Sequence, residues 1–137
     1  MRFIDTNILL YRVSQAPGDA AKAAIAASLL DGEDLCLSVQ VLQEFYLQAT
    51  RPSRVDPLTH EDAVALVSTW QRYPVQPITV ELMEAAFAAK ARWRVSYWDA
   101  AIIEAARALG CAELLSEDLS EGRNYDGVRV VNPFAAG

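Results

Sequence analysis

Four acidic residues lie at positions where an ordinary surface acid is not expected. Each ends a β-rich run or lies on an early turn of a predicted helix; they are Asp5, Glu44, Asp99 and Asp118. In an open α/β sheet, such positions meet at the carboxyl edge of the strands, where ligands bind. We therefore ask what chemistry several carboxylates at one edge could perform.

Each acid also has a purely structural interpretation. Asp5 could cap a following helix, and Asp99 could do the same as part of a capping box. Glu44 lies on a polar ridge of its helix and could be solvated, and Asp118 could belong to a turn. Taken one at a time, these residues leave both interpretations open.

The contexts of two acids favour a functional site. The first strand of such a sheet is usually central, so Asp5 would be buried and costly to ionise without a partner. The predicted helix that carries Asp99 is otherwise almost wholly apolar, apart from Glu104 and Arg107. At about 100° per residue, Asp99 lies roughly 140° from Glu104 and is therefore off the solvated face.

Taken together, the four acids point to a metal ion. Several carboxylates at one point repel one another, and without help some would stay protonated. A hard divalent cation resolves this, and Mg²⁺ or Mn²⁺ needs only a few carboxylate ligands because it keeps several waters. Cys36 and Cys111 are far apart in the sequence and form no zinc pattern, so we expect both to be reduced core residues.

The elements that must position these acids follow an alternating pattern. Five β-rich runs are separated by helical patterns; the runs are Arg2–Asp5, Leu35–Ser38, Val75–Thr79, Ala112–Leu115 and Val128–Val131. This alternation predicts an α/β fold with a mainly parallel sheet covered by helices on both faces. Prolines beside the third run predict an edge strand.

Helix start signals support this assignment. The predicted cap residues are Asp19, Ser38, Thr59, Thr79 and Ser96. The second connection holds two helices joined by Arg51–Leu58, and we expect this pair to project from the core. If Asp5 serves as a ligand, its cap position is expected to pass to Thr6 or Asn7.

Composition sets limits on the function. With 137 residues, the chain is expected to form one domain over 1–137. No basic leader and no apolar run of about 18 residues is present, so we expect a cytoplasmic protein without a membrane partner. The net charge of −6 argues against a protein that binds nucleic acid mainly through an overall positive charge.

The motifs around the four acids resemble a known family. Phe-Ile-Asp-Thr-Asn at the start, Glu44 on the third helix, Tyr-Trp-Asp-Ala-Ala-Ile and Leu-Leu-Ser-Glu-Asp-Leu are similar to the motifs of PIN domains, more closely to VapC-type toxins of toxin–antitoxin pairs. The closing Val-Val-Asn-Pro-Phe also resembles the end of such proteins. The resemblance covers essentially the whole chain, with its motifs in order.

The resemblance implies a PIN-like three-layer sandwich with a central five-stranded sheet, and a metal-dependent endoribonuclease. Its catalytic and metal-binding residues would be Asp5, Glu44, Asp99 and Asp118, with Thr6, Asn7 and Ser116 as supporting groups. One or two Mg²⁺ or Mn²⁺ ions would activate water, leaving a 5′-phosphate and a 3′-hydroxyl. The adjacent Glu117 leaves open which carboxylate the last motif uses, although the family pattern favours Asp118.

The resemblance also implies partners. Toxins of this kind usually form homodimers and are held inactive by an antitoxin that carries its own DNA-binding region. The RNA substrate would be contacted by basic residues outside the acidic motifs. The candidates are Arg51, Arg54, Lys90, Arg92 and Arg94, which could equally be ordinary solubilising charges.

Other readings fit less well. A catalytically silent PIN-like interaction module remains the alternative, because acids alone do not prove turnover. A receiver-like domain would pair adjacent acids after its first strand and use a late lysine, and a haloacid-dehalogenase-type phosphatase would use Asp-x-Asp. Here Asp5 is followed by Thr6 and Asn7, and no lysine occurs after Lys90.

Overall fold

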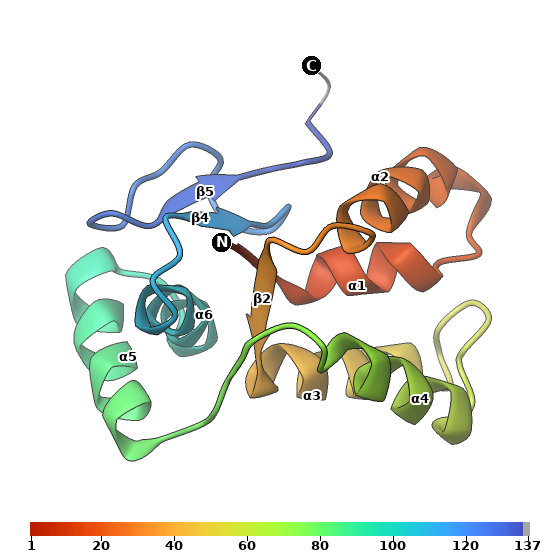
Figure 1. Ribbon diagram of the computed structural model, residues 1–137, viewed down its shortest axis with the longest axis horizontal. Coiled ribbons are helices and arrows are strands. Elements are labelled where there is room, and N and C mark those ends of the chain that lie inside the picture. Colours follow the sequence, from red (N-terminus) through yellow and green to blue (C-terminus); the bar gives the residue numbers. More distant parts are fainter. Residues whose placement is uncertain (136–137) are drawn as a thin grey trace.

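The computed structural model describes residues 1–135 and shows five strands and six α-helices in alternating order (Figure 1). The strands are β1 (Arg2–Ile4), β2 (Leu35–Ser38), β3 (Val75–Gln76), β4 (Glu113–Leu115) and β5 (Arg129–Val131). The helices are α1 (Thr6–Val13), α2 (Ala20–Leu30), α3 (Val39–Ala49), α4 (His60–Trp70), α5 (Val80–Trp93) and α6 (Tyr97–Ala108). All five predicted strands are confirmed, most of them one to three residues shorter than expected.

The strands form one sheet in the order β3-β2-β1-β4-β5, with every neighbouring pair parallel. β1 is central, and its Arg2 is paired with Leu35 of β2 on one side and with Glu113 of β4 on the other. β3 is an edge strand, as the flanking prolines predicted. The α/β fold class and its parallel five-stranded sheet are therefore confirmed.

The strand order reverses direction between β1 and β4. Right-handed crossovers from β1 to β2 to β3 place their helices on one face, whereas the return from β3 to β4 places α5 and α6 on the other. Figure 1 shows α5 and α6 on the opposite side of the strands from α1 and α2. The carboxyl ends of β1 and β4 therefore form the switch point at which such sheets bind ligands.

The core is continuous from the sheet to the helices on both sides. Phe3 and Ile4 of β1 and Leu114 of β4 are fully buried. The pair α3 and α4, which we expected to project, instead contributes to this core: Phe45 of α3 and Trp70 of α4 are buried within it, and their rings meet at 4.7 Å, edge to face. The buried residues of α3, which form its apolar stripe, face this core.

Most predicted helix caps are confirmed. A side-chain oxygen accepts a hydrogen bond from a backbone N–H of the first turn at Ser38, Thr59, Thr79 and Ser96. The prediction for Asp19 is wrong: its carboxylate makes no cap bond and accepts from the Ser14 hydroxyl at 2.6 Å instead. A nearby hydroxyl competes for that carboxylate with the backbone of α2.

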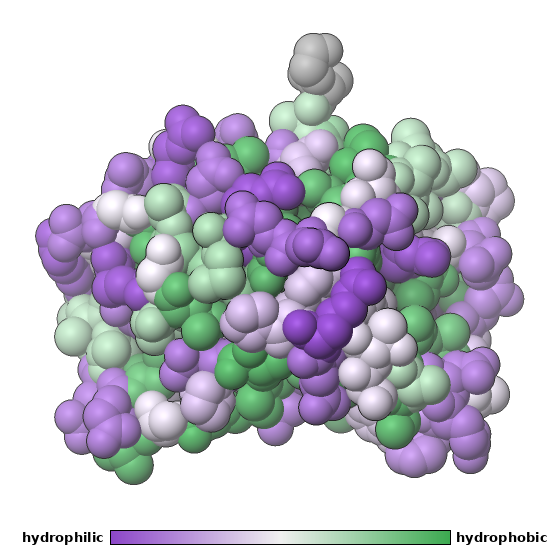
Figure 2. All heavy atoms as spheres, in the orientation of Figure 1, coloured by the Kyte–Doolittle hydropathy of each residue, from purple (hydrophilic) through white to green (hydrophobic). Residues whose placement is uncertain are grey.

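Across residues 1–135, none of the helices is long and apolar enough to cross a membrane. Figure 2 shows hydrophilic and hydrophobic residues interspersed over the face drawn in Figure 1, with hydrophilic residues gathered across its middle. A mixed surface of this kind is ordinary for a folded protein.

Candidate active site

Residues that follow β1 and β4 meet at the switch point of the sheet. The last pair of these strands joins Ile4 to Leu115, and the Asp5 amide continues the ladder by donating to the Leu115 carbonyl at 3.0 Å. This pairing fixes Asp5 beside Ser116, the first residue beyond β4. The two segments are 111 residues apart in the chain and reach the same point because their strands are neighbours.

Asp5 is held by both of its carboxylate oxygens. Oδ1 accepts the Thr6 amide at 2.7 Å, so Asp5 is itself the N-cap of α1. Oδ2 accepts the Ser116 hydroxyl at 2.7 Å, and Ser116 is fully buried. The expectation that the cap would pass to Thr6 or Asn7 is therefore wrong. One oxygen of the Asp5 carboxylate caps α1, and the other faces Ser116.

Burial shifts the ionisation of Asp5. The side chain is 8% exposed, and this desolvation raises its pKa to about 6. The bonds from Ser116 and Thr6 lower the pKa, while the charges of Glu44 and Asp118 raise it further. A bound cation would stabilise the ionised form of this carboxyl, which burial disfavours.

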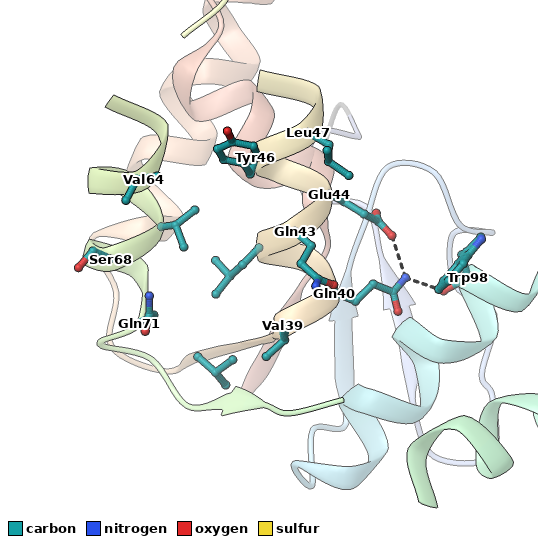
Figure 3. Close-up of a pocket in the computed structure, with 13 residues that line it drawn as sticks. Val39, Gln40, Gln43, Glu44, Tyr46, Leu47, Val64, Ser68, Gln71 and Trp98 are labelled. Carbon is teal, nitrogen blue, oxygen red and sulfur yellow. Dashed lines mark hydrogen bonds between the residues drawn. The ribbon is translucent and has the colours of Figure 1, made fainter. Parts of the chain in front are cut away.

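Glu44 reaches the site from α3 and is fixed by two donors. Its Oε2 accepts the Thr6 hydroxyl at 3.0 Å, and its Oε1 accepts Nε2 of Gln40 at 2.8 Å. Gln40 also donates to the carbonyl of Trp98 at 3.2 Å, which links α3 to the start of α6 (Figure 3). From the sequence, Gln40 was placed on the same polar ridge as Glu44, four residues before it, but was given no role in the site.

Asn7 connects the two acids that follow β1 and β4. Its Nδ2 lies 3.2 Å from Oδ2 of Asp118, 3.3 Å from Oγ of Ser116 and 3.5 Å from Oδ2 of Asp5. Its Oδ1 accepts the amide of Glu117 at 3.2 Å. One amide side chain thus ties the turn after β4 to the start of α1.

Glu117 points away from the other acids. It accepts from the Tyr11 hydroxyl at 2.5 Å and from the Lys22 ammonium at 2.6 Å. Burial raises the pKa of Glu117, but the bonds from Lys22 and Tyr11 outweigh it and leave that pKa lowered. Of the two adjacent acids, the structure therefore places Asp118 with the other three and pairs Glu117 with α1 and α2.

Asp99 lies on the first turn of α6 and is half-buried. Its backbone amide donates to the capping Ser96 at 3.1 Å, which leaves the carboxylate free for other contacts. Glu104 forms an ion pair with Arg107 at 3.1 Å on another part of the helix, as the helical geometry predicted. Asp99 is thus an acid without a role in capping or ion pairing within residues 1–135.

These side chains surround one small cavity of about 170 Å³. All four predicted acids line it, with the supporting Thr6 and Asn7. Ser116 lies behind Asp5 rather than on the wall. The cavity is completed by Leu10, Gln48, Trp98 and Ile102.

The donor set suits a magnesium-like ion, although it is not a closed cage. Within residues 1–135, no three acidic, histidine or cysteine side chains lie close enough to form a ready-made metal-binding group. Mg²⁺ does not require one, because it is bound through one or two carboxylates and keeps several waters. Asp5, which is buried and disfavoured as an anion, and Asp99, whose carboxylate is free, meet that requirement.

The five predicted substrate-binding residues do not line this cavity. Arg54 comes nearest through its contacts: its guanidinium donates at 3.4 Å to the carbonyl of Leu10, which is a cavity residue. Arg92 instead pairs with Asp126 at 3.4 Å and lies over the Trp93 ring. Arg51, Lys90 and Arg94 are exposed.

A second, larger cavity of about 1120 Å³ lies between α3 and α4 (Figure 3). Its walls are mainly apolar and include Leu42, Leu47, Val64 and Val67. Glu44 and Trp98 line both cavities, so the apolar groove adjoins the acidic one.

The parallel sheet and the acids at its switch point define the class of protein. The chain belongs to the PIN domain family, whose model matches residues 2–120. The match includes all four acids and both strands that position Asp5 and Ser116.

Solved structures with the same fold come from toxin–antitoxin systems. A toxin–antitoxin complex from Klebsiella pneumoniae superposes with a TM-score of 0.72 at 18% identity, over 98% of each chain. The sarcin-ricin loop cleaving toxin VapC20 of Mycobacterium tuberculosis gives 0.68 at 21% identity, over 86% of this chain and 90% of that one. DNA-bound VapBC from Salmonella typhimurium gives 0.63 at 19% identity, over 94% and 95%. A comparison with curated proteins finds no match.

Proposed function

We propose that this protein is a Mg²⁺- or Mn²⁺-dependent endoribonuclease and the toxin of a toxin–antitoxin pair. The observation that carries this proposal is the convergence of four carboxylates on one cavity, from the ends of β1 and β4 and from α3 and α6. Helix capping or a turn explains one acid at a time but not four acids at one cavity, whereas a cation that acts on a phosphodiester explains why they are together. The fold shared with VapC toxins supports the same assignment.

In this proposal, Asp5 and Asp99 would hold the ion, and Glu44 and Asp118 would add negative charge around it. A bound Mg²⁺ would supply activation of water and charge stabilisation at the scissile phosphate. The chain's own polar groups fix the acids: Ser116 orients Asp5, and Asn7 restrains Asp118. Thr6 and Gln40 together hold Glu44.

The protein and the RNA phosphates are both negatively charged, so the bound cation would have to offset the repulsion between them. Among the predicted basic residues, Arg54 has the contact closest to the cavity. It is therefore the first candidate to bind an RNA phosphate next to the one that is cleaved. Because Arg92 is already paired with Asp126, it is a weaker candidate. The negative net charge is consistent with local rather than bulk attraction to RNA.

The identity of the product ends tests this function. We expect purified protein with Mg²⁺ to cut a structured RNA into fragments with 5′-phosphate and 3′-hydroxyl ends, because water attacks the phosphorus and the 3′ oxygen leaves. End-specific labelling and ligation distinguish these from other termini. Fragments that end in a 2′,3′-cyclic phosphate would show attack by the RNA's own 2′-hydroxyl and contradict the proposal. Absence of any cleavage would favour the silent interaction module.

The two adjacent acids after β4 should respond differently to substitution. Asp118→Asn is expected to lower cleavage by roughly tenfold or more, because it removes charge from the cavity wall. Glu117→Gln is expected to change the rate by less than about twofold, because its carboxylate is engaged by Lys22 and Tyr11. The two initial rates, measured on one RNA substrate, check this. The reverse order of effects would assign the site to Glu117.

An antitoxin is the expected partner in this proposal, in line with the complexes formed by proteins of similar fold. The mainly apolar cavity between α3 and α4 would accept an apolar segment of that partner. A segment bound there lies beside Glu44 and Trp98, which border the acidic cavity. The antitoxin would bind DNA through a region of its own, and the toxin itself is proposed to form a homodimer.

A further inference from the structure

The two cysteines, which sequence reasoning treated as unrelated, meet in the core. Cys36 is fully buried on β2, and Cys111, just before β4, is 3% exposed. Their sulfur atoms are 2.7 Å apart, although the residues are 75 positions apart in the chain. This separation is about 0.7 Å longer than a disulfide bond of about 2.0 Å.

The fold itself brings the two thiols together. Cys36 is paired with Phe3 of the central strand, which fixes its position in the sheet. Cys111 is fixed by its amide, which donates to the Ala106 carbonyl near the end of α6 at 2.9 Å. Because α6 packs against β2, the two sulfurs face each other across this helix–sheet contact. Cys36 lies in a strand, and Cys111 lies in the short connection between α6 and β4, where its amide is hydrogen-bonded, so the pairing is a property of the native packing.

We propose that Cys36 and Cys111 form an oxidisable dithiol that small peroxides convert to an intramolecular disulfide. The proposal is independent of the RNA-cleaving function, because neither cysteine lines the acidic cavity. The product would join β2 to the connection between α6 and β4. β2 leads directly into the helix that carries Glu44, and α6 carries Asp99.

The chemistry assigns different tasks to the two sulfurs. The Cys111 thiolate attacks one oxygen of hydrogen peroxide, giving a sulfenic acid and releasing hydroxide. The Cys36 thiol then loses its proton, and its sulfur attacks the Cys111 sulfur and expels the hydroxyl group as water. Overall, two thiols and one peroxide give one disulfide and two waters, with the two electrons passing to the peroxide.

Local contacts support this assignment of the attacking group. The hydrogen bond with Cys36 lowers the pKa of Cys111, whereas the same bond, together with burial, raises the pKa of Cys36. Both cysteines are buried, and Cys111 is 3% exposed against 0% for Cys36. The proposed oxidant is a small peroxide because it is little larger than water and both thiols are buried.

The test compares purified wild-type protein before and after treatment with dilute hydrogen peroxide. We expect the mass to fall by two hydrogens, and the thiols counted in denaturant to fall from two to none, without a dimer on a non-reducing gel. The oxidised protein should melt higher by roughly 10 °C, because the bond closes a long loop of the unfolded chain. A reductant should reverse all three changes.

Single substitutions separate the two tasks. In Cys36→Ser, whose hydroxyl can still donate to Cys111, peroxide should leave a sulfenic acid at Cys111 that dimedone traps; in Cys111→Ala, the remaining Cys36 should react far more slowly. Because the mass and thiol counts come from the wild type, the proposal stays testable even if a variant folds poorly. Retention of both thiols, or a disulfide only between molecules, would overturn it.

Discussion

Replacing Asp99 by asparagine is expected to reduce the rate of RNA cleavage roughly a hundredfold or more. The change removes one negative charge from the cavity while keeping the shape of the side chain. Its carboxylate makes no hydrogen bond or ion pair within residues 1–135, and the helix start depends on the Asp99 amide rather than on its side chain. The melting temperature without metal should therefore change little.

A matched variant distinguishes a site effect from a general charge effect. Glu84→Gln removes one negative charge from an exposed position on α5, away from the cavity. Its cleavage rate should stay within about twofold of wild type, since exposed charges contribute little. Equal rates for Asp99→Asn and Glu84→Gln would remove Asp99 from the proposed site.

Replacing Asp5 by asparagine is expected to abolish cleavage and, unusually, to stabilise the metal-free protein. Burial raises the pKa of Asp5 from 3.8 to about 6. Between these values the unfolded chain has already released this proton while the folded chain still holds it. The contribution of Asp5 to the free energy of unfolding therefore falls as the pH rises from 3.8 to about 6.

The size of this effect follows from the pKa difference. At 1.36 kcal/mol per pKa unit, the ionised Asp5 costs up to about 3 kcal/mol at pH 7. A carboxamide cannot ionise, so Asp5→Asn should gain up to this amount at pH 7 and nearly nothing near pH 4. Part of this gain in stability is lost if the NH₂ group of the new asparagine faces Ser116 and Asn7, because both of these side chains donate to Asp5.

Denaturant unfolding of both proteins in EDTA, at several pH values from 4 to 7, measures this difference. Asp62→Asn provides the control, because Asp62 is exposed on the first turn of α4 and its substitution should cost less than about 0.5 kcal/mol at every pH. A stability difference between wild type and Asp5→Asn that does not grow with pH would show that burial of Asp5 is not costly.

Much of the fold could be predicted because its signals are local. The β-rich runs and the Ser and Thr caps depend on a few neighbouring residues, and their alternation leaves few topologies with right-handed crossovers. Pro74 and Pro77 identified the edge strand for the same reason. The expectation that α3 and α4 project was wrong because Phe45 and Trp70 are buried in one core with residues of the sheet, which lie far from them in the chain.

The candidate site shows the same limit. The acids could be selected from their positions, and the structure gathers all four at one cavity. The double use of the Asp5 carboxylate, the direction of Glu117 and the bond from Gln40 to the Trp98 carbonyl could not be predicted, because each is set by partners from other elements. The contact between Cys36 and Cys111 could not be predicted for the same reason.

The most direct test of a metal-dependent acidic site is the cleavage rate of one RNA by the wild-type protein before and after metal removal. We expect EDTA to stop cleavage, and added Mg²⁺ or Mn²⁺ to restore it to wild type but not to Asp99→Asn. Cleavage that continues in EDTA, or equal restoration of the variant, would show that cleavage does not depend on a metal ion held by Asp99.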